Sequence, residues 1–327
     1  MLYGTGKYTY ELVDGWAKCP EGFSFLNVPG IVVDSQDRVH VFSRSAHPVA
    51  IFDREGNLLT WWGEGFFKSL HGSCIGPDGT FYFTDGGHDT VTKYTPDGKL
   101  LLTLGNKDQP SDTGWKPNPD AKGIDFDFLG IDSIKGGPPF NKPTGVAVSS
   151  SGEIYVSDGY RNARVHKFAP DGTLLSSWGE PGRAPGQFRV PHWIWLDKQE
   201  RVWICDRHNN RIQIFNSKGK FLDQWTDLFL PAGLTIDEKE EIVYVAEISR
   251  RVSIFTIEGK LLARWGEGTY IHQRSTDGQE EDPPSLFLAP HGIAVDSRGD
   301  IYVGEIAQGV GGIDRGARTV QKFVRKT

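Results

Sequence analysis

The sequence lacks the features that mark several large classes of protein. Only three of its 327 residues are cysteine, Cys19, Cys74 and Cys205, and their spacing forms neither a disulfide framework nor a CxxC site. No apolar run approaches the roughly 18 residues that span a bilayer. The first residues lack the charged-then-apolar layout of a signal peptide. We therefore expect a soluble, cytoplasmic protein, with a secreted form that has lost its leader as the alternative.

The chain also lacks an excess of basic residues. Its formal net charge is −6, so we expect neither nucleic acid nor a membrane surface as a partner. No credible Ser-His-Asp or Cys-His set is present, and the glycine-rich segments are not followed by a helical pattern that would favour phosphate binding. Apolar residues make up 38% of the chain and 40 residues are glycine, which suits a buried core with many short strands and turns.

A pattern of about forty residues recurs six times along the chain, and such a period is typical of repeat architectures. Each copy opens with Pro or Leu, then one variable residue, a short apolar run and a turn. The copies begin at Pro29, Leu70, Pro143, Pro191, Pro231 and Pro290.

Each copy continues into four short strands separated by turns. In the third copy these are expected at 145–148, 153–157, 164–168 and 173–178, with Pro-Asp-Gly as the last turn. Four short antiparallel strands repeated six times predict an all-β fold, a six-bladed β-propeller of one domain over residues 1–327.

The two ends of the chain and two insertions modify this pattern. The sixth copy lacks a fourth strand, and residues 8–13 supply a spare one, so we expect both termini to build the last blade and remove exposed strand edges. Each insertion, at about 107–141 and at 269–285, connects the fourth strand of one blade to the first strand of the next blade. We expect them on the rim that carries the histidines described next, where they could cover a site.

Histidine occupies the variable position in every second copy. Reading that position along the six copies gives Gly30, His71, Thr144, His192, Ala232 and His291. Because the innermost strand of each propeller blade lines the central channel, three imidazoles from alternate blades would converge and leave one direction open. That is the layout of a catalytic zinc site, so His71, His192 and His291 are predicted to bind zinc or another divalent transition metal. The histidines outside this register are interpreted as surface or loop residues: His40, His47, His88, His166, His208 and His272.

A second ring of positions lies fourteen residues after the first. It contains Asp85, Asp158, Asp206 and Glu305, which we interpret as structural acids that tie loops to neighbouring backbone. In the first copy a cation, Arg44, replaces the acid. Arg207 follows Asp206, and Tyr160 lies two residues after Asp158. Arg44, Tyr160 and Arg207 are therefore predicted to lie close together at the mouth of the central channel, above the histidines. A basic stripe of Arg161, Arg164 and Lys167 is interpreted as solvated surface.

Several segments resemble the peptidyl-α-hydroxyglycine α-amidating lyases, a family of NHL-repeat propellers. These segments are 41–44, 70–72, 84–85, 143–148, 157–164, 186–192, 206–213 and 290–292. The resemblance implies a zinc-dependent enzyme that cleaves a carbinolamide into a primary amide and glyoxylate. It also implies a structural calcium ion, although Gly292 stands where the family has the aspartate that helps to hold it.

The residue types fit that reaction. Cleaving R–CO–NH–CH(OH)–COO⁻ requires a hydroxyl to lose its proton, a carboxylate to be held and the leaving nitrogen to be protonated. Tyr160 would be the general base, and Arg207 and the metal would favour its phenolate. Arg44 would grip the carboxylate with its planar fork.

Other functions stay open at this point. A ureidoglycolate-type lyase and a metal-dependent hydrolase or lactonase are alternative enzymes, and a non-catalytic NHL interaction scaffold is the alternative of another class. A scaffold would not need histidine in alternate blades. The acid-to-arginine change at Arg44 favours a lyase, because it implies a small substrate that bears a carboxylate. The oligomeric state is not predicted.

Overall fold

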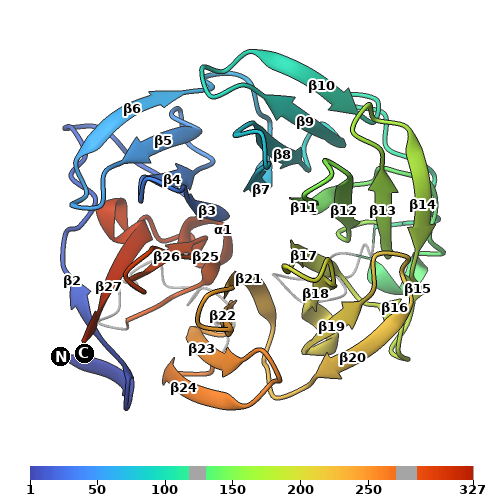
Figure 1. Ribbon diagram of the computed structural model, residues 1–327. Helices are drawn as coiled ribbons and strands as arrows, with labels where there is room; N and C mark the ends of the chain where they lie inside the picture. The colour runs from blue at the N-terminus through green and yellow to red at the C-terminus, as the bar shows by residue number, and fades with distance from the viewer. Residues whose placement is uncertain (118–129, 270–285, 327) are drawn as a thin grey trace. The chain divides into compact units, whose positions relative to one another are not determined.

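The computed structural model describes residues 1–117, 130–269 and 286–326 and consists mainly of β-strands (Figure 1). Six antiparallel sheets of four or five strands follow one another along the chain. This confirms the predicted six-bladed β-propeller, and the blades are numbered here in the order of their inner strands. Contacts within the chain define two compact units, one of residues 65–231 and one of residues 1–64 and 232–327.

The unit of residues 65–231 holds blades two, three and four. Each blade is a sheet of four strands in chain order. The strands of blade two are β7 (Leu70–Ile75), β8 (Phe81–Asp85), β9 (Thr90–Tyr94) and β10 (Leu100–Leu104). Those of blade three are β11 (Pro143–Val148), β12 (Ile154–Asp158), β13 (Arg164–Phe168) and β14 (Leu174–Trp178). Those of blade four are β17 (Pro191–Leu196), β18 (Val202–Asp206), β19 (Arg211–Phe215) and β20 (Phe221–Trp225), preceded by the short parallel pair β15 (Glu180–Pro181) and β16 (Gln187–Phe188).

The other unit holds blades one, five and six. Blade one consists of β3 (Gly30–Val33), β4 (Val39–Phe42), β5 (Val49–Phe52) and β6 (Leu58–Trp62). Blade five consists of β21 (Pro231–Asp237), β22 (Ile242–Glu247), β23 (Arg251–Thr256) and β24 (Leu261–Gly266). Blade six combines β25 (Pro290–Val295), β26 (Ile301–Glu305) and β27 (Val320–Lys326) with two N-terminal strands, β2 (Tyr8–Val13) and β1 (Leu2–Thr5).

Blade six confirms the predicted joining of the two termini. Strand β2 pairs antiparallel with β27, from Thr9 opposite Lys326 to Val13 opposite Lys322. Tyr10 is fully buried and its ring lies 5.4 Å from that of Trp265. The outermost strand, β1, was not predicted, because its short and partly exposed sequence carries no hydrophobic alternation. With β2 in place, β27 does not present a free edge.

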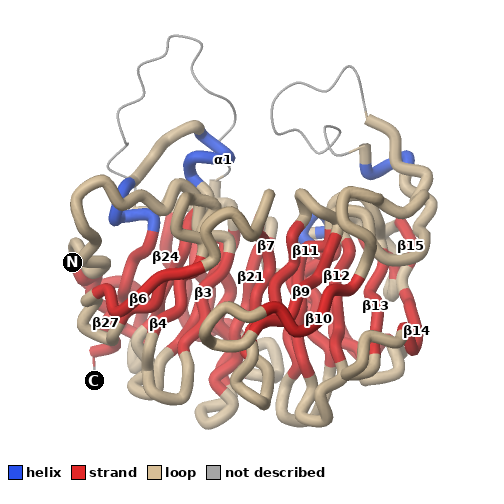
Figure 2. The backbone as a smooth tube through the Cα atoms, turned by 90° about the horizontal axis from the view of Figure 1, so that it is seen from above, coloured by secondary structure: helices blue, strands red, loops and turns tan. Residues whose placement is uncertain are grey.

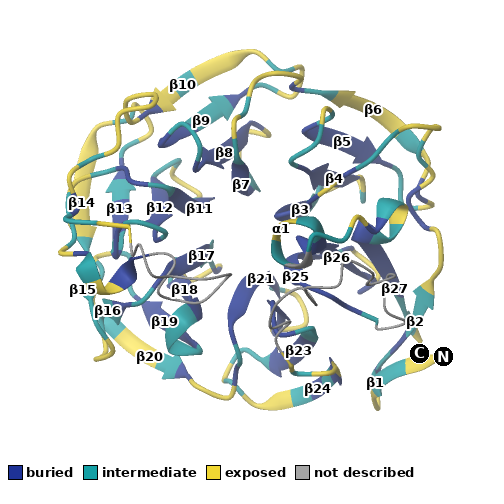
Figure 3. Cartoon of the chain, turned by 180° about the vertical axis from the view of Figure 1, so that it is seen from behind, coloured by how far each residue is buried: buried dark blue, intermediate teal, exposed yellow. Residues whose placement is uncertain are grey.

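Burial falls from the inner to the outer strands within a blade (Figure 3). In blade three, every residue of β12 is buried, whereas four of the five residues of β14 are exposed. The inner strands are covered on both faces, so their sequences are almost continuously apolar, while the fourth strand has one face in solvent. This explains exposed side chains such as Leu174 and Leu175 without a binding function.

The acidic ring has the structural role that the sequence predicts. The Asp85 carboxylate accepts hydrogen bonds from the backbone N–H groups of Lys68 and Ser69, both at 2.8 Å, just before the inner strand of the same blade. Asp158 accepts from the Asn141 N–H at 3.0 Å in the same way. Each acid therefore ties the loop after the second strand to the segment that enters the first. In blade one the Arg44 N–H still bonds the Asn27 carbonyl, at 2.9 Å, so the arginine side chain is not needed for this link.

The interpretation of His40 and His166 as surface or loop residues is wrong. His40 lies in β4 and His166 in β13, and both are buried. His40 Nε2 is 3.0 Å from a carboxylate oxygen of Asp34, and His166 Nδ1 is 2.7 Å from the Ser177 hydroxyl. These middle strands have a neighbouring strand along each edge and are covered on both faces. A polar residue in them is therefore buried on whichever face its side chain lies. Of the other four histidines of that set, His47, His88 and His208 lie outside the strands and are partly exposed, and His272 lies outside the described residues.

Short helical segments connect strands at a few places and lie at the strand ends (Figure 2). These are the 3-10 helices η2 (Ile131–Ser133), η3 (Arg207–Asn209) and η4 (Gly316–Thr319) and the single helical turn α1 (Ala307–Gly311). None of the helices in the described ranges is long and apolar enough to cross a bilayer.

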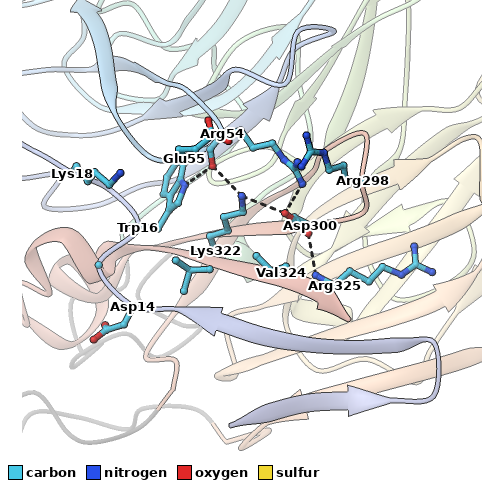
Figure 4. Close-up of a pocket in the computed structure, with 12 residues that line it drawn as sticks. Asp14, Trp16, Lys18, Arg54, Glu55, Arg298, Asp300, Lys322, Val324 and Arg325 are labelled. Atoms are coloured by element: carbon cyan, nitrogen blue, oxygen red, sulfur yellow. Dashed lines mark hydrogen bonds and ion pairs between the residues drawn. The ribbon is translucent and has the colours of Figure 1, made fainter. Parts of the chain in front are cut away.

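A pocket of about 700 Å³ opens in the unit that holds blades one, five and six (Figure 4). The Lys322 ammonium in its wall donates to the Arg54 carbonyl at 2.9 Å and lies 3.3 Å from Asp300. The Arg54 guanidinium bonds Asp296 and Asp300, each at 2.6 Å. These buried ion pairs join blade one to blade six. Asp300, which lines the pocket, lies in the turn after the end of β25 opposite to His291, so the pocket is separate from the histidine position.

Replacing Glu305 by alanine tests the structural role of the acidic ring. Glu305 is fully buried, accepts the N–H groups of Leu288 and Ala289 at 2.6 and 2.9 Å and pairs with Arg315 at 2.5 Å. Removing one partner of a buried ion pair leaves the other uncompensated, so Glu305→Ala should lower the free energy of unfolding by about 3–5 kcal/mol. Denaturant titration measures this loss. The exposed Glu258→Ala control should change it by less than about 0.5 kcal/mol, and equal effects would contradict the role.

Candidate active site

His71 lies at the second position of β7 and is buried. Its Nδ1 is 2.6 Å from the carbonyl oxygen of Thr144, at the second position of β11 in the next blade. A carbonyl oxygen only accepts hydrogen bonds, so Nδ1 carries the proton and Nε2 presents a lone pair. This is the usual second-shell arrangement of a histidine that binds a metal through Nε2.

His192 lies at the same position of β17 in blade four and is also buried. Its ring centroid is 4.7 Å from that of His71, with the two rings nearly perpendicular. The Nε2 atoms of His71 and His192 lie 2.8 and 3.0 Å from one oxygen, the hydroxyl of Tyr160. Within this unit the structure therefore brings together two of the predicted metal ligands and the predicted base.

His291 occupies the same position of β25 in the other unit and is equally buried. Its Nδ1 lies 2.7 Å from the carbonyl oxygen of Pro29, so Nε2 again presents the lone pair. His71, His192 and His291 together form a buried group that could hold a metal ion. Three neutral imidazoles without a carboxylate or thiolate suit a transition metal of the zinc type.

The position after His291 does not fit the calcium ligand that the family resemblance implies. A side chain at Gly292 would place its Cβ 2.9–3.0 Å from backbone atoms of Gly30 and Ile31. Such distances require the backbone of blade one to move. Residue 292 therefore offers no room for an aspartate in this structure.

Arg207 lies beside Tyr160, as predicted. It begins η3, its side chain is buried, and its guanidinium carbon is 5.3 Å from the centroid of the Tyr160 ring. A cation over an aromatic face is attracted by the ring quadrupole. Burial, together with the positive charges of Arg207 and Arg189, lowers the pKa of His208 well below its usual value. His208 is therefore neutral at neutral pH, and Arg207 is the cation that lies over the Tyr160 ring.

Arg44 follows β4 in the unit of blades one, five and six, and its side chain is partly exposed. Its position after the second strand is the one that carries the structural acids in other blades. Its approach to Tyr160 and to the substrate stays a prediction.

The first insertion packs beside Tyr160. Its described residues include Trp115, Ile131 and Ile134, which share one apolar cluster with Tyr160. Asn162 ties this insertion to the loop that carries the phenol: its side-chain oxygen accepts the Gly137 N–H at 3.1 Å. The first insertion therefore contacts the loop that carries Tyr160, and its covering of the site stays a prediction. Most of the second insertion lies outside the described residues.

The interpretation of Arg161 as solvated surface is wrong. Arg161 is only partly exposed, and its guanidinium carbon lies 3.7 Å from the centroid of the Trp115 ring. Burial lowers the pKa of its guanidinium from the usual value. Nothing in the sequence connects the two residues, because Trp115 lies in an irregular insertion that precedes the repeat containing Arg161. The only indication in the sequence that Arg161 has a functional role is its position directly after the candidate base, Tyr160.

Comparison with known proteins agrees with the fold and the repeats. A model of the NHL repeat matches residues 140–168. The chain is 29% identical over 71% of its length to human NHL repeat-containing protein 3 and spans 64% of that protein. It is 31% identical over 56% of its length to Drosophila melanogaster peptidyl-alpha-hydroxyglycine alpha-amidating lyase 1, and 32% identical over 58% to a probable lyase of this kind from Caenorhabditis elegans. It spans 32% and 47% of these two proteins, which is less than two thirds of each relative.

Solved structures show the same fold at low sequence identity. A streptogramin B lyase superposes with a TM-score of 0.58 at 15% identity, over 97% of this chain and 98% of the other. A gluconolactonase from Xanthomonas campestris gives 0.60 at 13% identity, over 97% and 90%. The chain is therefore a six-bladed β-propeller with NHL repeats, similar in sequence to the peptidyl-α-hydroxyglycine α-amidating lyases and to NHL repeat-containing protein 3.

Proposed function

We propose that the chain is a metal-dependent lyase. It would split the C–N bond of an α-hydroxyglycine carbinolamide, R–CO–NH–CH(OH)–COO⁻, into a primary amide and glyoxylate. One observation carries the proposal: a single phenol oxygen lies within hydrogen-bonding distance of two buried imidazole Nε2 atoms, under an arginine guanidinium. Relatives named as amidating lyases, at about 30% identity, support the same chemistry.

His71, His192 and His291 would hold the metal, and zinc suits the three imidazoles best. When bound, such an ion supplies Lewis acidity and orients the oxygen atoms of the substrate. The carbonyl groups of Thr144 and Pro29 fix the tautomers of two of these rings, so that Nε2 is available as a ligand. Loss of either carbonyl contact would leave the ring orientation undefined.

Tyr160 would move the proton that the reaction requires. Cleavage transfers one proton from the hydroxyl oxygen of the substrate to the departing amide nitrogen, and the electron pair of the C–N bond leaves with that nitrogen. The Tyr160 oxygen would accept the first proton and the phenol would then donate it to the nitrogen. The Arg207 cation over the ring stabilises negative charge on the phenol during this transfer.

Arg44 would hold the substrate carboxylate. A guanidinium can donate two parallel hydrogen bonds to a carboxylate, which fixes orientation as well as affinity. The replacement of an acid by Arg44 supports this role, since blade one keeps the backbone link of this loop without a carboxylate at this position. The proposed partner is thus a small molecule with a carboxylate next to the reacting carbon.

A ureidoglycolate-type lyase differs only in the group R, and the same residues would serve it. A hydrolase or lactonase would instead attack a carbonyl carbon. The superposed gluconolactonase shares only the fold, at 13% identity. The phenol between the two imidazoles favours a lyase, because the lyase needs a base for the substrate hydroxyl, whereas a bound hydroxide can attack a carbonyl carbon without one.

The histidine assignment predicts metal content. The purified protein should hold one transition metal per chain, and His71→Ala, His192→Ala and His291→Ala should each lower both metal content and glyoxylate release. Elemental analysis by mass spectrometry measures the first quantity. His88→Ala, a loop histidine outside this group, is the control and should keep its metal. Full occupancy in a triple alanine variant would refute the assignment.

The base assignment predicts the effect of Tyr160→Phe. A positioned general base contributes about 10²–10⁴-fold, so kcat should fall by that order while metal content is unchanged, because the phenol is not one of the three ligands. Glyoxylate and the primary amide should form in equal amounts in the parent enzyme. Near-parent turnover in Tyr160→Phe, or formation of a carboxylic acid in place of the amide, would point to the hydrolase.

The carboxylate assignment predicts the effect of Arg44→Lys. Lysine keeps the charge but loses the planar fork, so KM should rise about tenfold or more, which corresponds to one charge-assisted hydrogen bond. A methyl ester of the substrate should already react poorly with the parent enzyme. Equal rates for the ester and the free acid would exclude Arg44 as the carboxylate ligand.

A further inference from the structure

Arg161, directly after the candidate base, has one of its faces covered by Trp115. The 3.7 Å between the guanidinium carbon and the ring centroid is short even for a cation over an indole. Stacking uses the face of the planar guanidinium group. Its five N–H donors lie in the plane and stay available to an acceptor.

No protein acceptor takes up those donors within residues 1–117, 130–269 and 286–326. Neighbouring arginines of the same unit have partners: Arg164 donates to the Gly179 carbonyl at 2.6 Å, and Arg189 pairs with Asp132 at 3.2 Å. The acidic group that acts on Arg161 is Asp89, through charge at longer range, and its carboxylate accepts the Lys142 N–H at 2.8 Å. Arg161 is therefore a partly buried cation without a directly bonded counter-ion among the described residues.

The cation is also held in place. The Thr113 hydroxyl donates to the Arg161 carbonyl, which fixes the backbone at this residue. The next residue, Asn162, is fully buried and donates to Asp158 at 2.8 Å. Trp115 packs against the apolar cluster that also supports Tyr160. Little conformational entropy would be lost when the guanidinium binds a ligand, because its supports are already ordered.

Arg161 directly follows Tyr160 in the chain, and its guanidinium lies over an indole that belongs to the same apolar cluster as Tyr160. The cation is therefore held beside the loop that carries the candidate base, within the unit of residues 65–231. A substrate whose R group extends from Tyr160 toward Trp115 would bring that group to the guanidinium.

We propose that Arg161 and Trp115 form an anion subsite that selects substrates whose R group carries a carboxylate. Arg161 donates to that second carboxylate, while the carboxylate of the hydroxyglycine is held elsewhere in the site. This inference rests on the proposed lyase function and narrows its substrate class to carbinolamides with an acidic acyl group. The two carboxylates of such a substrate match two separate arginines, Arg44 and Arg161.

Two substrates of equal length test the subsite: N-glutaryl-α-hydroxyglycine, with a terminal carboxylate, and N-pentanoyl-α-hydroxyglycine, with a methyl group in its place. For the metal-loaded parent enzyme, kcat/KM for the glutaryl substrate should exceed that for the pentanoyl substrate roughly 10- to 100-fold, as one charge-assisted contact provides. Arg161→Gln should abolish this preference through KM and leave the pentanoyl rate unchanged. Arg161→Lys should keep part of the preference, and Trp115→Leu should reduce it.

The matched control is Arg183→Gln, which removes the same charge from an exposed position of the same unit and should keep the preference. Circular dichroism of each variant verifies folding. Equal kcat/KM for the two substrates in the parent enzyme, or an undiminished preference in a folded Arg161→Gln, would overturn the subsite while leaving the lyase intact. Release of glyoxylate from neither substrate would instead overturn the lyase on which the subsite rests.

Discussion

The candidate site depends on the direction in which buried imidazoles point. In β7 and β25, the histidine donates from Nδ1 to a backbone carbonyl at the start of the next blade's inner strand. A backbone carbonyl cannot donate in return, so the lone pair on Nε2 faces the other way. The repeat places both histidines at the same strand position, and each meets the backbone where the neighbouring inner strand begins, at Thr144 in one case and at Pro29, one repeat position earlier, in the other. A group of histidines that could hold a metal thus arises from a packing contact.

The second contribution comes from a segment outside the repeat. The insertion between β10 and β11 places Trp115, Ile131 and Ile134 against the cluster that contains Tyr160 and clamps the loop through Asn162. Two consecutive residues of that loop then have different surroundings. Tyr160 faces two imidazoles and an arginine, and Arg161 is stacked on an indole. A propeller that supplies a common centre can in this way acquire its own substrate preference from one inserted segment.

Sequence reasoning succeeded where one residue position carried one physical role in every blade. The histidine register, the acids at Asp85 and Asp158 and the proximity of Tyr160 to Arg207 all follow from spacing within the repeat. It failed for His40 and His166, because a strand covered on both faces buries polar residues that a single-sided sheet would expose. The extra strand β1 was also not predicted, since its four residues show no alternation of apolar and polar side chains that would indicate pairing with β2.

The sequence alone determined the β-propeller, the strand exchange between the termini and the three histidines, because a repeat converts spacing along the chain into equivalent places in space. Only the tertiary structure decided that one phenol oxygen meets two imidazoles and that Arg161 stacks on Trp115. These contacts join residues of different repeats or of an irregular insertion. Their distances depend on how side chains pack after the strands have paired, and no periodicity in the sequence encodes that packing.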